Sequence, residues 1–171
     1  MATKTNNKST PKLVDTSHDL PAETRQQMIN LLNTQLADTF DLFSQTKQAH
    51  WNVKGMQFYQ LHELYDELAG CVVEWADLIA ERAVMLGGAA TGTVRMAASA
   101  TRLNEYSSNA IGSKASVSAL VDRYAALAES TRKAIDTADE AKDADTADLF
   151  TEISRGLDKS LWFLEAHLQM D

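Results

Sequence analysis

Apolar residues recur at helical spacing over almost the whole chain after Pro21, and this pattern predicts four long helices. The first helix extends from about 21 to 55 and the second from 58 to 86, where Gly87 and Gly88 end it. Two stripes define the remaining helices: Val117, Leu120, Val121, Tyr124, Leu127 and Ile135, then Leu149, Ile153, Leu157, Leu161, Leu164 and Leu168.

The connections between these helices predict the topology. Two are short, and one, from about 89 to 115, is long enough to cross the bundle. Thr101 to Ser107 is expected to form a short helix within it. No sustained alternation of polar and apolar residues predicts strands. The fold class is therefore all-α, a four-helix bundle with one crossover, which is the ferritin-like arrangement.

Composition narrows the class of protein. With 171 residues and 44% hydrophobic content, the chain suits one domain with a sizeable core. A net charge of −8 argues against a body that binds nucleic acid, because neutralising phosphates requires clustered Lys and Arg. One cysteine forms no intrachain disulfide, and no signal peptide or membrane span is evident, so we expect a cytoplasmic protein.

The first residues differ in composition from the rest. Lys4, Lys8 and Lys12 lie among Thr, Ser and Asn, with no acidic residue before Asp15. We therefore divide the chain into a flexible basic tail at 1–20 and a bundle at 21–171. The tail is either a solubilising terminus or, when many copies decorate one particle, a sequence-independent and salt-sensitive DNA contact that would place the protein at the nucleoid.

Metal-ligand residue types recur in the second helix. His62 and Asp66 are four residues apart, as are Asp77 and Glu81, so each pair projects from one helix face. The eleven residues from Asp66 to Asp77 correspond to about 16 Å along the axis, too far for one ion. Either the pairs are solvated charges, or a second copy of the helix packs antiparallel and brings unlike pairs together.

An antiparallel dimer would make two identical sites about 22 Å apart, with its two-fold axis near Cys71 and Val72. His50 follows Leu32 by five full helical turns, so it points along the apolar stripe of the first helix and can join the site. Taken singly, each residue is better explained as a hydrogen-bonded or solvated side chain. Together they favour a metal site, because unpaired carboxylates are costly on a face shared with Val73 and Val84.

An acidic run lies between the last two helices, and two interpretations remain open for it. Asp145 or Thr146 would cap the last helix in the ordinary way. Alternatively, Asp143, Asp145 and Asp148 line a negative channel, at a contact between three subunits, that concentrates cations toward an interior.

The chain resembles the Dps family of miniferritins in the run Lys47–Gly55 (KQAHWNVKG), then at Leu61, His62 and Asp66, and at Asp77, Ala80, Glu81, Arg82 and Leu86 to Gly88. The resemblance continues through the run from Asp145 to Asp148 and covers nearly everything after the tail. It implies a hollow homo-dodecamer of two-fold dimers, in which His50, His62 and Asp66 of one chain face Asp77 and Glu81 of the other.

The resemblance also implies a function. It predicts a ferroxidase that oxidises Fe(II), preferably with hydrogen peroxide, at up to two ions per dimer-interface site, stores ferric mineral and protects DNA. Imidazole and carboxylate ligands suit iron, although they also suit zinc or manganese. Trp51, next to His50, either shields the site or packs against it. The alternative function is a nucleoid-associated DNA-binding protein whose metal site is structural.

Overall fold

The computed structural model describes residues 13–169, which form five helices joined by loops. They are α1 (Ala22–Asn52), α2 (Phe58–Met85), α3 (Val94–Ala100), α4 (Ser113–Glu140) and α5 (Ala144–Glu165). The lysines of the predicted tail, Lys4, Lys8 and Lys12, lie outside the described residues. None of the described helices is long and apolar enough to cross a membrane.

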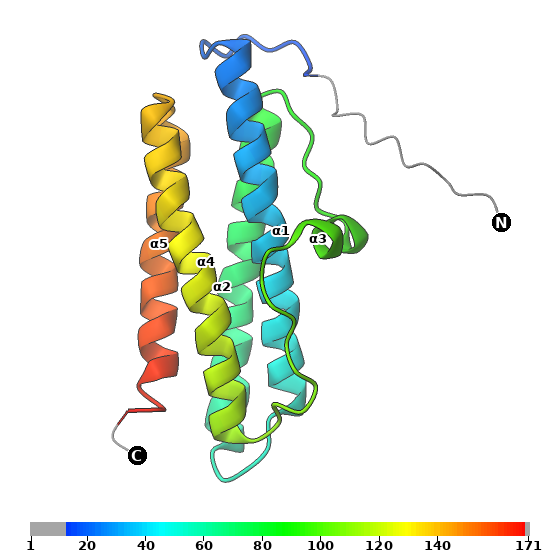
Figure 1. Ribbon diagram of the computed structural model, residues 1–171, viewed down its shortest axis with the longest axis vertical. Helices are drawn as coiled ribbons and strands as arrows, with labels where there is room; N and C mark the ends of the chain where they lie inside the picture. Colours follow the sequence, from blue (N-terminus) through cyan, green and yellow to red (C-terminus); the bar gives the residue numbers. More distant parts are fainter. Residues whose placement is uncertain (1–12, 170–171) are drawn as a thin grey trace, which may run out of the picture.

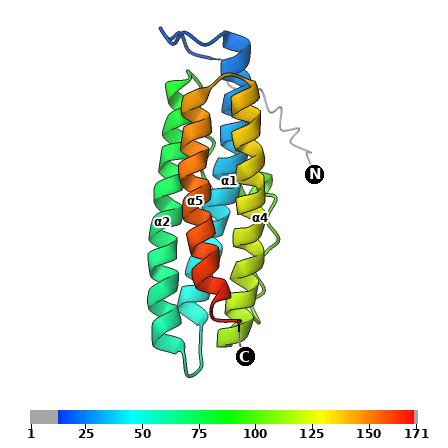
Figure 2. The same ribbon diagram turned by 90° about the vertical axis from the view of Figure 1, so that its left-hand side faces the viewer.

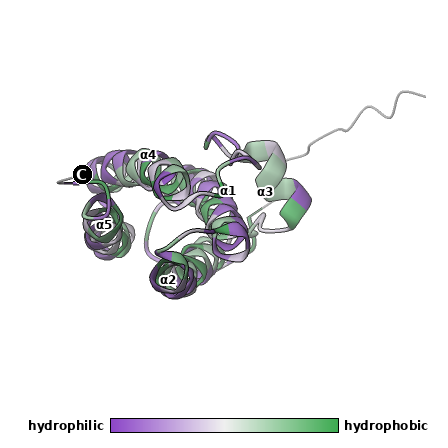
Figure 3. Cartoon of the chain, turned by 90° about the horizontal axis from the view of Figure 1, so that it is seen from below, coloured by the Kyte–Doolittle hydropathy of each residue, from purple (hydrophilic) through white to green (hydrophobic). Residues whose placement is uncertain are grey.

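The long helices form two hairpins that pack side by side (Figures 1 and 2). α1 packs chiefly on α2, and α4 on α5, while the crossover carries the chain along the bundle from the end of α2 to the start of α4. Viewed along the bundle axis, α3 lies outside the ring of four helices, beside α1 (Figure 3). The prediction of an all-α, ferritin-like bundle with a short crossover helix is confirmed.

Each long helix buries the apolar stripe that the sequence predicts. The fully or almost fully buried side chains include Leu32, Leu36, Leu61, Val72, Ile79, Leu120, Tyr124, Leu127, Ile153 and Leu157. Phe43 and Trp75, at the edges of these stripes, are only partly buried against the same core.

The short helix of the crossover lies earlier than predicted. It spans Val94–Ala100, and the Thr93 side chain accepts a hydrogen bond from the Met96 amide at its start. The predicted stretch 101–107 is instead held in a non-helical path, because its polar groups bond to α1. The amide and guanidinium of Arg102 both donate to the buried Asp38 carboxylate, at 2.6 to 2.8 Å.

The start of α5 also differs from the prediction, since Asp143 is the N-cap instead of Asp145 or Thr146. The Asp143 carboxylate accepts from the Thr146 amide at 3.1 Å and from the Thr146 hydroxyl at 2.6 Å. Lys142, with φ 64°, makes the tight turn that precedes it. The cap is therefore the first residue after the turn. The sequence alone did not single out this residue, because several acidic residues of the run could have served as the cap.

Residues 13–20, which the sequence analysis assigned to the tail, lie across the end of α2. The Val14 amide donates to the Gly87 carbonyl at 2.9 Å, and the Arg25 guanidinium donates to the Leu86 carbonyl at 2.9 Å. Gly87 adopts φ 85°, and a Cβ there would lie 2.9 Å from the Val14 carbonyl oxygen. A glycine is required at this helix end on both counts.

Gly156 tests the packing of α5 on α2. A helical Gly→Ala change ordinarily stabilises by up to about 1 kcal/mol, but here the added Cβ would fall on the Trp75 ring. Overpacking of this kind costs about 1–3 kcal/mol, so we expect Gly156→Ala to lower the free energy of unfolding by about 1–2 kcal/mol. Denaturant titration at fixed protein concentration measures this free energy of unfolding. Combining it with Trp75→Leu should remove most of the loss relative to Trp75→Leu alone; an equal loss in both backgrounds would exclude this clash.

Candidate metal centre

Two of the predicted ligands, His50 and His62, lie against each other where α1 ends and α2 begins. His50 is in the last turn of α1 and His62 is in the second turn of α2. Their imidazole rings stack with centroids 3.8 Å apart and planes inclined by 18°. The ring of Phe58 lies 5.2 Å from that of His62.

Reciprocal hydrogen bonds fix this pair. His50 Nδ1 donates to the His62 carbonyl at 2.8 Å, and His62 Nδ1 donates to the His50 carbonyl at 3.0 Å. Because a carbonyl oxygen only accepts, both Nδ1 atoms carry hydrogen. In the neutral rings each Nε2 is then the lone-pair nitrogen, the form in which a histidine binds a metal.

Asp66, one turn after His62, is held by a cation from α1. Lys47 Nζ donates to Asp66 Oδ1 at 2.5 Å. This hydrogen bond and the lysine charge hold the pKa of the Asp66 carboxyl below its ordinary value, with smaller contributions from the nearby His50 and His62. The group is therefore a carboxylate at neutral pH, but the chain's own ammonium occupies one of its oxygens.

Asp77 and Glu81 are exposed farther along α2, on the side that carries Val73 and Val84. No ion pair or hydrogen bond engages either carboxylate within residues 13–169. Asp77 helps to line a groove of about 450 Å³ that is mostly apolar. The lining includes Leu36 and Phe40 of α1 and Val73 and Ala80 of α2.

The single chain brings His50, His62 and Asp66 to one part of the bundle and leaves Asp77 and Glu81 apart from them. Among the described residues, no three His, Cys, Asp or Glu side chains gather closely enough to hold a metal ion. Residues 13–169 of one chain therefore do not bring the predicted ligands together into a single centre. Each chain presents two half-sites.

Trp51 follows His50 and is 66% exposed at the end of α1. Its ring lies 5.8 Å from Lys47 Nζ, within cation–π range. Lys47 thus contacts both an aromatic neighbour of the half-site and one of its ligands. Lys47 was not among the predicted site residues, although its spacing of three residues from His50 places the two on neighbouring parts of one helix face.

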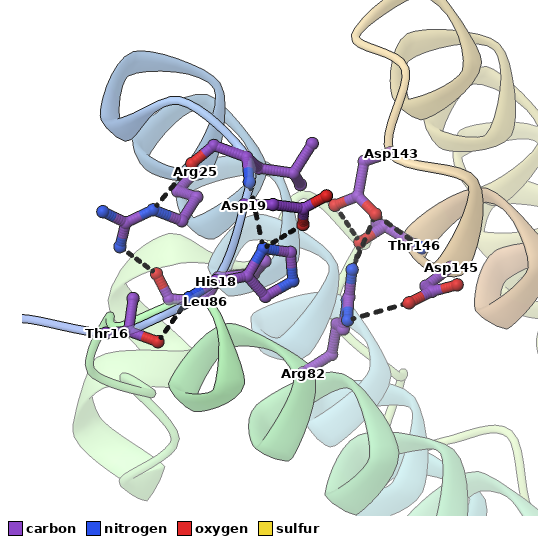
Figure 4. Close-up of polar contacts among 10 residues, drawn as sticks. Thr16, His18, Asp19, Arg25, Arg82, Leu86, Asp143, Asp145 and Thr146 are labelled. Carbon is purple, nitrogen blue, oxygen red and sulfur yellow. Dashed lines mark hydrogen bonds and ion pairs between the residues drawn. The ribbon is translucent and has the colours of Figure 1, made fainter.

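The three aspartates of the predicted channel have different surroundings. Figure 4 shows two of them, Asp143 and Asp145, beside Arg82. Asp143 is 2% exposed and bonds to Arg82 Nη2 at 2.6 Å, in addition to capping α5. Asp145 is largely exposed and lies 3.6 Å from Arg82 Nη1, and Asp148 is exposed. Arg82 thus partly neutralises the charge of this turn. Local sequence patterns do not predict this contact, because Arg82 and Asp143 are 61 residues apart.

Known proteins resemble this chain in both sequence and fold. The ferritin-like domain family matches residues 29–171. The DNA protection during starvation protein of Agrobacterium fabrum is 48% identical over 154 residues, which cover 90% of this chain and 95% of the relative. The solved structure of Mycobacterium smegmatis Dps gives a TM-score of 0.86 at 32% identity, covering 91% of this chain and 94% of that one.

A second solved structure, the DPS protein from Vibrio cholerae, gives a TM-score of 0.85 at 25% identity. The match covers 94% of this chain and 100% of that one. That protein is described as a member of a broad superfamily of ferritin-like diiron-carboxylate proteins.

Lys47→Gln tests whether the lysine competes with a cation for Asp66. Removing the ammonium should tighten Zn²⁺ binding at this site by about two- to fivefold, the range expected for one exposed ion pair. Isothermal titration calorimetry with Zn²⁺, which is not oxidised, measures the affinity. Lys133→Gln, which removes an equal charge from an ion pair with Glu129 on α4, is the matched control. An unchanged affinity in Lys47→Gln would show that the lysine does not compete.

Proposed function

Because the chain belongs to the Dps family of ferritin-like proteins, we propose that it is a ferroxidase that oxidises ferrous iron with hydrogen peroxide and stores the ferric product. Removing both reagents would protect DNA, in keeping with the name of the Agrobacterium fabrum relative. The observation that carries the proposal is the histidine pair, whose reciprocal bonds leave two Nε2 lone pairs beside the Asp66 carboxylate.

The complete site forms between two chains. When α2 packs antiparallel on its copy, Asp77 and Glu81 of one chain come opposite His62 and Asp66 of the other, and the two-fold axis repeats the site. The exposed apolar residues around Asp77 support this arrangement, since a second copy would bury them. Such a contact would also enclose carboxylates that the single chain leaves in water.

The ligand types suit iron as a substrate. Two imidazoles and three carboxylates provide hard and intermediate ligands without a thiolate, a set that accepts ferrous and ferric iron. Glu81, with two oxygens, is our candidate for a ligand shared by two ions. Two ferrous ions supply both electrons needed to reduce one peroxide: 2 Fe²⁺ + H₂O₂ + 2 H⁺ gives 2 Fe³⁺ + 2 H₂O. The paired transfer avoids a one-electron step that would release hydroxyl radical.

Storage requires an enclosed space, and we propose that six such dimers close into a hollow dodecamer, as the family resemblance implies. In that particle, ferric product formed at the dimer interfaces would collect inside. The tail lysines would then be present in many copies, which would favour a weak, salt-sensitive contact with DNA.

Anaerobic loading with Fe²⁺ followed by limiting peroxide tests the activity. We expect rapid oxidation of about two ferrous ions per peroxide, followed by absorbance, with no hydroxyl radical detected by spin trapping. His50→Ala combined with Asp77→Ala removes one ligand from each half-site and should slow oxidation to the rate of a buffer blank. Glu152→Ala, an exposed position on α5, is the matched control for a lost carboxylate.

The same experiment distinguishes the ferroxidase from the alternative function. A nucleoid-associated protein with a structural metal site would retard DNA but oxidise iron no faster than the buffer. Wild-type oxidation at the blank rate would therefore exclude the ferroxidase, whatever the DNA result.

We further propose that iron reaches the interior past Asp145 and Asp148, while Asp143 serves chiefly as the cap and ion-pair partner of α5. Asp145→Asn with Asp148→Asn should slow mineralisation about three- to tenfold through weaker electrostatic attraction, with assembly intact. Asp143→Asn should instead lower the free energy of unfolding by up to about 3–5 kcal/mol, because it leaves Arg82 without its buried partner. Mineralisation rates and denaturation curves distinguish the two effects, and an unchanged rate in the double variant would count against the channel.

A further inference from the structure

The His50 carbonyl has an unusual hydrogen-bond partner for its position. In a continuing helix it would accept from the amide four residues on, which belongs to Lys54. α1 ends at Asn52, and the Lys54 amide donates instead to the Ile111 carbonyl at 2.8 Å. The imidazole of His62 thus bonds to a helix-terminal carbonyl that the main chain does not use.

The segment that captures the Lys54 amide lies at the far end of the crossover. Lys54 and Gly112 form an isolated parallel bridge, and the Ser113 hydroxyl donates to the Lys54 carbonyl at 3.1 Å. Both main-chain groups of Lys54 are therefore bonded to 111–113. Gly55, at φ 124°, turns the chain immediately afterwards, and a Cβ there would lie 2.9 Å from Ser113 Oγ.

Buried hydrogen bonds anchor this bridge to α2. The Ser116 hydroxyl donates to the Ser113 carbonyl at 3.0 Å, so the Tyr65 hydroxyl, 2.8 Å away, is the donor to Ser116 Oγ. Burial raises the pKa of Tyr65, which keeps this phenol protonated. Tyr65 precedes Asp66, so the start of α4, the end of α1 and the ligand-bearing turn of α2 are connected through a few hydrogen bonds.

We propose that the bridge formed by Lys54, Gly112 and Ser113 is a positioning element of the metal centre. It holds the Lys54 amide away from the His50 carbonyl, and that carbonyl then orients His62 with hydrogen on Nδ1 and the lone pair on Nε2. The crossover thereby positions a ligand to which it contributes no side chain. The metal-binding purpose of this positioning rests on the proposed function, but the hydrogen bonds themselves are present in the single chain.

Two glycines, Gly112 in the bridge and Gly55 next to it, provide a matched pair of variants. Gly55→Ala strains the backbone at positive φ and pushes a methyl group against Ser113 Oγ. Gly112→Ala adds the same methyl group where nothing lies within 4 Å and where φ is −74°. Only the first should loosen the bridge. Ser113→Ala removes the hydroxyl alone and provides a milder variant, should Gly55→Ala fail to assemble.

The readout is the tautomer of His62 in the assembled protein, by solid-state NMR of ¹⁵N-histidine. Replacing His18 and His167 with Gln in every variant leaves only the two histidines of the pair. We expect both to carry hydrogen on Nδ1 in this parent and in Gly112→Ala. In Gly55→Ala, and to a smaller extent in Ser113→Ala, His62 should show mixed tautomers, and Zn²⁺ affinity should fall about tenfold, as for other residues that orient a metal ligand.

The outcomes separate this inference from the proposed function. A fixed tautomer and unchanged Zn²⁺ affinity in both Gly55→Ala and Ser113→Ala would overturn the positioning role. If the parent protein bound no Zn²⁺, the metal site itself would be refuted, while the tautomer measurement would still decide whether the bridge orients His62. Equal effects of Gly55→Ala and Gly112→Ala would also overturn the inference, because only one of them strains the bridge.

Discussion

The two hydrogen bonds exchanged by His50 and His62 are the interaction on which the candidate site depends. Each ring uses Nδ1 to bond the other residue's carbonyl, so one pair of contacts joins α1 to α2 and also sets both tautomers. Neutral histidines in this arrangement present Nε2 as a ligand without further rearrangement. The stacked rings, 3.8 Å apart, follow directly from this reciprocal bonding.

The rest of the site is shaped by the separation of its two ligand pairs along one face of α2. Asp66 has a cation from its own chain, whereas Asp77 and Glu81 have none among residues 13–169. Exposed carboxylates are well solvated by water. Burying them under a second copy of the chain would be energetically unfavourable unless a bound cation neutralised them. In the proposed dimer, metal binding and dimer formation would therefore stabilise each other.

The sequence was sufficient for the features that depend on helical periodicity. The apolar stripes predicted the buried faces of α1, α2, α4 and α5. Spacing of four residues singled out both pairs of candidate ligands, whose role stays a prediction. The sequence was insufficient where a contact with a residue far along the chain determines the local structure. Asp38 of α1 holds Arg102, which keeps 101–107 out of a helix, and Arg82 of α2 pairs with Asp143, which favours that aspartate as the cap. Lys47 escaped notice because its partner is set by packing.

Acidic residues that pair with a cation of the same chain and acidic residues that do not contribute differently to the electrostatic field outside the molecule. Asp38, Asp66 and Asp143 are each held by a cation of the same chain, and two of these three are buried. Their charges therefore contribute little to the field outside the chain. Much of the net charge of −8 must then arise from exposed acids such as Asp77, Glu81 and Asp148, which attract cations from solution. Among the acids proposed to guide or bind iron, the fold thus leaves Asp77, Glu81 and Asp148 without a cation from residues 13–169, whereas Asp66 and Asp145 each lie beside one.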